Sequence, residues 1–334
     1  MTSETVVQVP TLPSEPVEKR EAIIRTQGLT KKFGAQVAVK DVTFEVPRGK
    51  IFGFIGPSGS GKTTTIRMLT GYYHPTEGEV FVFDTPPVKF SESQREKIGY
   101  MPQLFVLYPN LSVWENMNFA ASIYGMSFWR RKKLKELLDF VELAGHRHKI
   151  AREISGGMQR RLTLAATLVH DPELIFLDEP TAGVDPVLRS KFWDHFRNLR
   201  DQGRTLFVTT QYVSEAAYCD LVAVMGEGVL LMVDTPKGLR YRAFGGDVVE
   251  LRTAEPVTPR LQALLQEQPF VKGKVERLSA NDFSIVVDEA KTAIPALMDW
   301  SRNNDLEVQA VEEFLPPFDD VFVQLVKEER ENAA

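Results

Sequence analysis

The sequence predicts an α/β fold built on a largely parallel sheet, followed by a smaller α+β domain. Apolar runs of strand length alternate with helical stretches over residues 22–242, a pattern typical of βαβ units. From residue 246 to about residue 330 the expected order changes to strand, helix, strand, strand, helix, strand, as in a ferredoxin-like domain. A glycine-rich loop motif near the start of the alternating region is the feature around which that region is organised.

The composition of the whole chain limits its class. At 334 residues, the chain is long enough for about two domains. Its net charge of −5 disfavours nucleic acid as a partner. No apolar run approaches the ~18 residues of a membrane span, and the N-terminus lacks a signal-peptide pattern. If the protein works on a membrane, we therefore expect it to dock onto a separate membrane subunit.

The first hundred residues begin with a polar, proline-containing stretch, residues 1–21, for which we expect disorder. Two paired strands are then expected over 22–29 and 37–46. The loop between them carries Phe33, for which two interpretations stay open. The ring either stacks on a nucleobase or packs within its own loop.

A motif of eight residues follows the apolar run Ile51–Ile55 directly. It matches G-x-x-x-x-G-K-[ST] at every fixed position, with Gly56, Pro57, Ser58, Gly59, Ser60, Gly61, Lys62 and Thr63, and Thr64 continues it into a helical run. Such glycines let backbone N–H groups turn inward to form an anion nest, and the helix N-terminus adds positive charge. Lys62 can supply a positive charge to the β- and γ-phosphates of a nucleotide, and the Thr63 hydroxyl can serve as a ligand of Mg²⁺.

A helix-rich segment is expected over about residues 104–170. Ser112 and Glu115 have the spacing of a capping box at one helix start. The basic run 130–133 is either a solvated helix face, which we favour, or a contact with anionic lipid headgroups. His146 and His148 lack further metal-ligand spacing, and we interpret them as loop residues.

Two adjacent carboxylates, Asp178 and Glu179, end the apolar run 174–177. Ligands of open parallel sheets bind at the carboxyl ends of the strands, so these side chains are candidate site residues. A helix over about 187–200 and a strand over 205–208 follow, and Gln211 stands just beyond that strand. The strands 221–225 and 229–233 complete the first domain, and an amphipathic stretch, 320–327, ends the second.

The motifs in their order resemble those of the ATP-binding subunits of ABC transporters. The resemblance covers roughly residues 22–240 and rests on a Walker A motif (56–63), a Q-loop glutamine (Gln103), a Walker B motif with its glutamate (174–179) and a D-loop (182–185). The signature motif is represented by Ser155, Gly156, Gly157 and Met158. Met158 stands where glutamine is common, and Gln211 stands where a switch histidine is usual. Gln211, the segment 107–116 and the closing segment 318–322 are similar to ATPases of the daunorubicin-resistance, multidrug exporter type.

The resemblance implies a mechanism and partners. ATP and Mg²⁺ are the expected cofactors, with Thr63, Gln103 and Asp178 as the metal shell and Glu179 as the general base. Lys62 and Gln211 are expected to act in the reaction, Gln211 as an organiser that does not take a proton. Ser155–Met158 and Asp185 are expected to bind nucleotide across a dimer of two ATPase subunits. The expected location is the cytoplasmic face of the membrane, beneath a permease that exports a lipid, drug-like or glycan substrate.

Two other functions remain open on the sequence. One is a non-transport ATPase of the same class, but such proteins usually carry long coiled-coil inserts, a second ATPase unit or basic arms, and none of these features is visible in this sequence. The other is a nucleotide-dependent regulator with little turnover, which only Gln211 suggests and which the intact Glu179 opposes.

Overall fold

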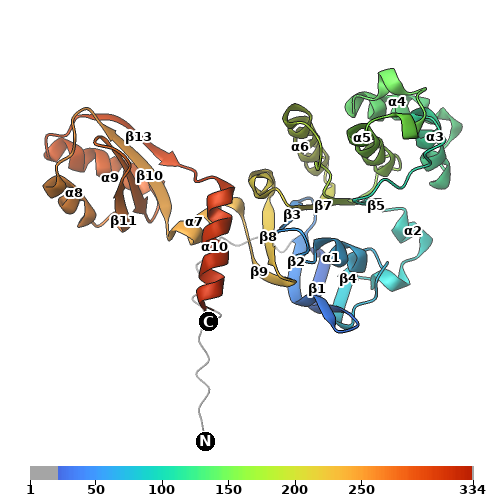
Figure 1. Cartoon of the computed structure of the whole chain (residues 1–334), viewed down its shortest axis with the longest axis horizontal. Coiled ribbons are helices and arrows are strands. Elements are labelled where there is room, and N and C mark those ends of the chain that lie inside the picture. Colours follow the sequence, from blue (N-terminus) through green and yellow to red (C-terminus); the bar gives the residue numbers. More distant parts are fainter. Residues whose placement is uncertain (1–21, 333–334) are drawn as a thin grey trace, which may run out of the picture.

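A computed structural model describes residues 22–332, with side chains described except at residues 128 and 329–332. The expected disordered tail, 1–21, lies outside the described residues. Figure 1 shows a larger unit that holds β1–β9 and α1–α6, and a smaller unit that holds β10–β13 with α8 and α9. Helices α7 and α10 lie between the two units. None of the helices within 22–332 combines the length and the apolar character needed to cross a membrane.

The central sheet of the larger unit has the strand order β5-β6-β7-β3-β8-β9. These strands are β5 (Ile98–Met101), β6 (Leu174–Asp178), β7 (Thr205–Thr210), β3 (Ile51–Ile55), β8 (Leu221–Gly226) and β9 (Val229–Asp234). Neighbouring strands run parallel except β8 and β9, which are antiparallel. Every residue of β3 is buried, as expected for a central strand of a parallel sheet covered on both faces.

One face of this sheet is covered by a second, antiparallel sheet of order β2-β1-β4 and by helix α1. Its elements are β1 (Ala22–Phe33), β2 (Gln36–Pro47), β4 (Glu77–Val82) and α1 (Lys62–Leu69). Both strands of the predicted hairpin are longer than expected, so only Gly34 and Ala35 connect them. Phenylalanine rings at 44, 52, 54 and 207 pack together between the sheets. A 3-10 turn (Pro87–Lys89) and the short helix α2 (Glu92–Arg95) lead to β5.

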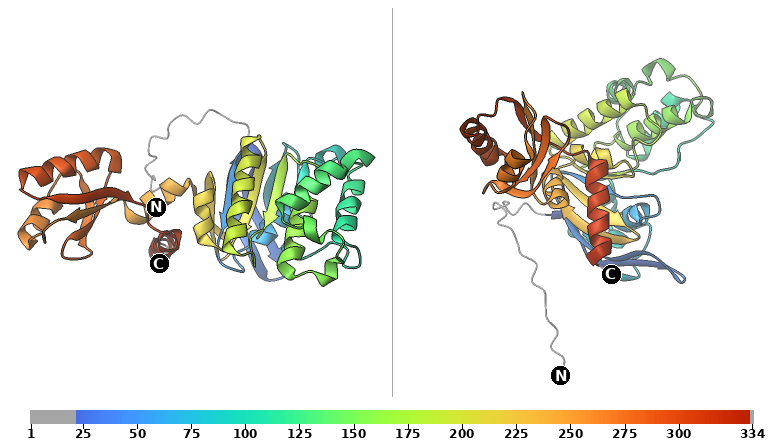
Figure 2. Two further views of the ribbon diagram at one scale, coloured as in Figure 1. Left: turned by 90° about the horizontal axis from the view of Figure 1, so that it is seen from above. Right: turned by 60° about the vertical axis from the view of Figure 1, so that its left-hand side comes forward.

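The opposite face is covered by helices α5 (Gly156–Thr167) and α6 (Pro186–Asp201). Helices α3 (Val113–Ile123) and α4 (Arg131–Phe140) extend the helical layer away from the sheet (Figure 2). Short 3-10 turns connect them at Phe128–Arg130, Ala144–His146 and Ala151–Glu153. The predicted capping box is confirmed, because the Ser112 hydroxyl accepts from the Glu115 amide at 3.2 Å and the Glu115 carboxylate accepts from the Ser112 amide at 2.7 Å.

The smaller unit follows helix α7 (Pro236–Phe244), which ends at Gly245 in the left-handed region with φ of 74°. Its elements are β10 (Asp247–Thr253), α8 (Pro259–Gln266), β11 (Val271–Arg277), β12 (Asp282–Val287), α9 (Ala290–Asn303) and β13 (Val308–Phe314). The strands pair antiparallel in the order β11-β12-β10-β13. The unit has a hydrophobic core of its own.

The last helix, α10 (Phe318–Asn332), differs from the expectation that residues 246–330 form one domain. Its buried side chains, Phe318, Val321 and Leu325, belong to the core of the larger unit. They face Leu239 of α7 and Ala216 of a 3-10 segment, η5 (Val213–Tyr218). The amphipathic pattern predicted a helix with one buried face, but periodicity does not say which surface that face covers.

Candidate functional site

The glycine-rich loop joins β3 to α1 in the way that its motif predicts. Helix α1 begins after Gly61, whose φ of 95° lies in the left-handed region. A Cβ atom at Gly61 would stand 2.7 Å from the carbonyl oxygen of Ala38. This turn therefore requires glycine both for its backbone angle and for the close approach of β2. The loop ends with the helix N-terminus, where free N–H groups favour an anion.

A cavity of about 510 Å³ opens beside this loop. Its lining consists of Phe33, Gln36, Val37, Ala38, Ser58, Gly59, Gly61, Lys62, Thr63, Thr64, Gln103, Glu179, Glu227 and Gly228. The structure thus brings the predicted aromatic residue, the loop and the predicted base to one cavity. Phe33 is 43% exposed, and its ring meets the Tyr73 ring edge-on at 5.2 Å. Both interpretations of Phe33 remain compatible with this position, since one ring face can pack while another meets a base.

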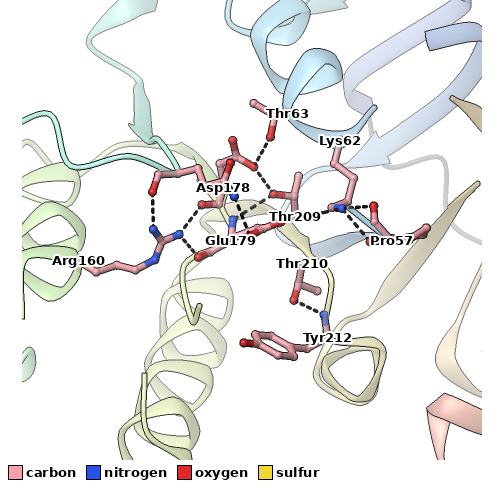
Figure 3. Close-up of polar contacts among 11 residues, drawn as sticks. Pro57, Lys62, Thr63, Arg160, Asp178, Glu179, Thr209, Thr210 and Tyr212 are labelled. Carbon is pink, nitrogen blue, oxygen red and sulfur yellow. Dashed lines mark hydrogen bonds and ion pairs between the residues drawn. The ribbon is translucent and has the colours of Figure 1, made fainter. Parts of the chain in front are cut away.

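Lys62 is the cation of the site, and its side chain is only 4% exposed. Its Nζ donates to the carbonyl oxygens of Gly56 at 2.8 Å and Pro57 at 2.9 Å (Figure 3). It also lies 4.0 Å from a carboxylate oxygen of Glu179. Burial lowers the pKa of Lys62, while the charges of Glu179 and Asp178 act in the opposite direction. A buried ammonium group held by neutral carbonyls is well placed to attract phosphate oxygens.

Asp178 occupies the carboxyl end of β6 and is fully buried. Its Oδ1 accepts from the hydroxyl groups of Thr209 at 2.6 Å and Thr63 at 3.2 Å. Its Oδ2 is buried and has no hydrogen-bond partner among the described residues. Such an orphaned carboxylate oxygen is unfavourable unless a cation or water meets it. The donor set, one carboxylate and one hydroxyl beside a phosphate loop, fits Mg²⁺, which takes few protein ligands and completes its shell with phosphate oxygens and water.

Glu179 follows with a backbone φ of 52°, which is uncommon for a residue other than glycine. Its amide donates to the carbonyl and the hydroxyl oxygen of Thr209, at 3.0 Å and 3.1 Å. Its Oε2 accepts from the Gln103 side-chain amide at 3.1 Å. The carboxylate therefore faces the cavity with a fixed orientation. Non-glycine residues held in this region cluster at functional sites.

Two residues of the site were not predicted as such. Thr209 holds Asp178 and Glu179 together, and its position at the end of a buried strand beside β6 was the available signal. Arg160, on the signature helix α5, reaches the end of β6 as well. Its guanidinium donates to the carbonyl oxygens of Gln103, Asp178, Glu179 and Pro180. No sequence pattern indicated Arg160, because all four acceptors are backbone atoms of distant segments.

Several predicted residues lie outside the cavity. Ser155 caps α5 by accepting from the Met158 amide at 3.3 Å, and Gly156, Gly157 and Met158 form the first turn of that helix. Asp185 caps α6 by accepting from the Leu188 amide at 3.0 Å. Gln211 follows β7 as an exposed residue, without a hydrogen bond to any described residue. The structure therefore does not bring these residues to the cavity beside the glycine-rich loop of their own chain.

Arg130, from the basic run, and His148 have contacts within the helical layer. Arg130 donates to Asn118 at 3.3 Å and Ser122 at 2.8 Å, which ties its turn to α3. His148 accepts from Arg147 at 3.0 Å. No group of three His, Cys, Asp or Glu side chains suited to a metal ion occurs within the described part of the chain.

Comparison with known proteins gives consistent matches. A family model described as "ABC transporter" matches residues 39–182. The probable multidrug ABC transporter ATP-binding protein YbhF of Escherichia coli K12 is 39% identical over 224 residues, which are 67% of this chain and 39% of that protein. The Nod factor export ATP-binding protein I of Burkholderia lata is 37% identical over 241 residues, 72% of this chain and 79% of that protein.

Two solved structures extend the comparison. An ATP-binding subunit of an ABC transporter matches with a TM-score of 0.61 and 27% identity, over 67% of this chain and 93% of that chain. A dimeric ATP-binding cassette bound to ADP and phosphate matches with a TM-score of 0.59 and 27% identity, over 64% of this chain and 98% of that chain. The match to this chain covers about two fifths, 39%, of the length of the E. coli relative.

Proposed function

This chain belongs to the family of ATP-binding subunits of ABC transporters, and we propose that it hydrolyses ATP to power export through a separate membrane permease. The observation that supports the proposal is the convergence of three charged side chains at the glycine-rich loop. Lys62, at the start of α1, and Glu179, just after β6, line the cavity. The buried Asp178, at the end of β6, meets the loop through its hydrogen bond with Thr63. One relative is named as a probable multidrug ABC transporter ATP-binding protein and another as a Nod factor export ATP-binding protein. These names favour export of a lipid, drug-like or glycan substrate.

The chemistry follows from the roles that these side chains suit. Lys62 neutralises charge on the β- and γ-phosphates, and the loop N–H groups bind the phosphate oxygens. Thr63 and Asp178, with Gln103, are the residues that would hold Mg²⁺, which supplies further charge neutralisation when it is bound. Glu179 accepts the proton of the attacking water as general base. The Gln103 amide orients that carboxylate through the contact at 3.1 Å. Gln211 donates to the γ-phosphate or the water as an organiser.

A second ATPase subunit completes each site in this proposal. Ser155–Met158 and Asp185 lie outside the cavity of their own chain, and the helix N-terminus at Ser155 is suited to bind a phosphate. A relative of known structure is dimeric. We expect ATP and the change Glu179→Gln to produce a dimer, measured by light scattering. Ser155→Arg should block the dimer while leaving ATP binding to the monomer, and a persistent monomer at high ATP would point to a different partner subunit.

The permease is expected to dock at the segment 103–113, at the cytoplasmic face of the membrane. Leu104 and Val106 are exposed by 75% and 63%, whereas Phe105 and Leu107 pack against the core. The two exposed side chains provide an apolar contact next to the Gln103 that orients Glu179. Cysteine cross-links from Leu104 or Val106 to a co-expressed permease would support this position, and cross-links confined to the smaller unit would contradict it.

Residues 22–242 form the proposed ATP-binding domain, with the helical subdomain at about 104–170. For residues 246 to about 317 we propose a ferredoxin-like accessory domain with a regulatory role. The strand order β11-β12-β10-β13 and the antiparallel pairing support that assignment. Helix α10 follows this domain and packs against η5 and α7 of the larger unit.

The decisive experiment compares nucleotide binding with turnover in two variants. Glu179→Gln should bind ATP normally and lose about 10²–10⁴-fold in hydrolysis rate, because an amide cannot accept the proton. Lys62→Ala should weaken ATP binding itself. Near-normal turnover of Glu179→Gln would exclude Glu179 as the base. Undetectable turnover of the parent protein with its permease would instead favour a nucleotide-dependent regulator.

A further inference from the structure

Arg160 connects three parts of the larger unit through backbone atoms alone. Its own backbone belongs to the first turns of the signature helix α5. Its Nη1 donates to the carbonyl oxygen of Gln103 at 2.6 Å, and its Nη2 donates to that of Asp178 at 2.8 Å. The same guanidinium also donates to the carbonyl oxygens of Glu179 and Pro180. The signature helix, the Q-loop and the end of β6 therefore meet at one side chain (Figure 3).

This arrangement needs an arginine. The planar guanidinium carries five N–H donors in a fixed fork, whereas the ammonium of lysine carries three donors at one point. Four carbonyl oxygens from two separate segments can be met at once only by the fork. One of these acceptors is the carbonyl of Glu179, whose backbone stands in the left-handed region with φ of 52°. Arg160 thus bonds the peptide unit that orients the proposed base.

We propose that Arg160 is a positioning residue that makes ATP hydrolysis depend on the placement of the signature helix. The inference rests on the proposed hydrolysis at Glu179. When α5 occupies the position seen in the structure, the guanidinium holds the backbone of residues 178–180 and the Q-loop in one arrangement. A displacement of α5 withdraws those hydrogen bonds, so the base and Gln103 lose their fixed geometry. Arg160 would thus couple the position of the helical subdomain to the geometry of the proposed base. This coupling is separate from the one that the Gln103 side chain provides through its hydrogen bond to Glu179.

The neighbouring Arg161 provides a matched control. Its Nη1 donates to the carbonyl oxygen of Val141 at 3.1 Å and lies 3.7 Å from Glu142. These contacts lie between α5 and the segment that follows α4, away from the nucleotide cavity. Arg160→Gln and Arg161→Gln therefore remove the same charge from the same helix, but only the first removes bonds to the end of β6.

The test measures ATP turnover and nucleotide affinity separately, using Mg·ATP for turnover and a fluorescent ATP analogue for binding. Because a misplacement of about 1 Å can cost about 10²-fold in rate, Arg160→Gln should lower kcat by roughly ten- to a hundredfold. Its Kd for the analogue should stay within about threefold. Arg160→Lys should recover part of the loss, and Arg161→Gln should keep kcat within about twofold of the parent.

Hydrogen exchange supplies an independent readout for variants that fold poorly. The amides of residues 179, 181 and 182 and of residues 103–107 should exchange faster in Arg160→Gln than in Arg161→Gln, with equal exchange in the central sheet. Two results would overturn the inference. One is an equal kcat for Arg160→Gln and Arg161→Gln, and the other is a loss of ATP-analogue affinity in Arg160→Gln that is as large, in fold-change, as its loss of kcat. A parent protein without ATP turnover would refute the proposed function instead, so the two failures are distinguishable.

Discussion

The hydroxyl group of Thr209 donates to Oδ1 of Asp178 over 2.6 Å, and the two residues are directly paired across the parallel strands β6 and β7. Both side chains are fully buried. The same hydroxyl oxygen accepts from the Glu179 amide at 3.1 Å. A single side chain thus fixes the carboxylate that would ligand Mg²⁺ and the backbone of the proposed base.

We expect Thr209→Val to lower ATP turnover by about 10- to 100-fold, the rate equivalent of the ~1.5–3 kcal/mol of a hydrogen bond to a charged group. Valine keeps the shape of the side chain and removes only the hydroxyl. The control is Thr205→Val on the same strand, where the buried hydroxyl accepts from the Gly49 amide at 2.9 Å. Both variants should lose stability, but only Thr209→Val should lose turnover per folded molecule. Equal turnover of the two would contradict the role of Thr209.

The parallel core and its loop were predictable because their signals are local. The run Ile51–Ile55 is apolar without interruption, as a strand buried on both faces must be, and the glycine motif follows it directly. The capping box at Ser112 and Glu115 lies within four residues. The contacts of Arg160 and the packing of α10 join segments far apart in sequence, and their acceptors or partners carry no sequence signature. These parts of the site and of the fold therefore required the structure.

Gln211 provides a second test of the proposed reaction. Its side chain is exposed and next to β7, so it is free to reach a nucleotide bound between two subunits. Gln211→Ala should cut turnover, while Gln211→His should retain a substantial part, because both glutamine and histidine offer a nitrogen donor. Turnover should be measured against pH for all three forms. An alanine variant as fast as the parent would make Gln211 an ordinary solvated residue.

Helix α10 should stabilise the ATP-binding unit although it comes last in the chain. Leu325 is 1% exposed within the core of that unit. Leu325→Ala should reduce the free energy of unfolding by about 2–5 kcal/mol, the usual cost of a cavity left by a buried leucine. Val323, on the same helix, is 48% exposed. Val323→Ala should therefore change the free energy of unfolding by less than about 0.5 kcal/mol. Denaturant unfolding measures both, and equal effects would contradict the packing of α10.

The single cysteine, Cys219, should make the stability of the protein fall at alkaline pH. Burial raises the pKa of its thiol, with smaller contributions in the same direction from Glu215 and Asp220. The unfolded chain ionises this thiol near its ordinary value of about 8.5, whereas the folded chain keeps it neutral. Above that pH the unfolded state binds fewer protons, so the free energy of unfolding decreases as pH rises. Below it, this group contributes no pH dependence.

Cys219→Ala should therefore show a smaller alkaline loss than the parent. From pH 9 to pH 10 we expect the difference between the two losses to be about 1 kcal/mol, as the linkage relation gives for one thiol. Only the slopes are compared, because alanine also leaves a small cavity that shifts the curve uniformly. The thiol of the folded parent should resist iodoacetamide at pH 8 and react once urea unfolds the chain, since the thiolate is the reactive form. Rapid labelling of the folded protein, or parallel stability curves for parent and variant, would show that the thiol ionises in the native state.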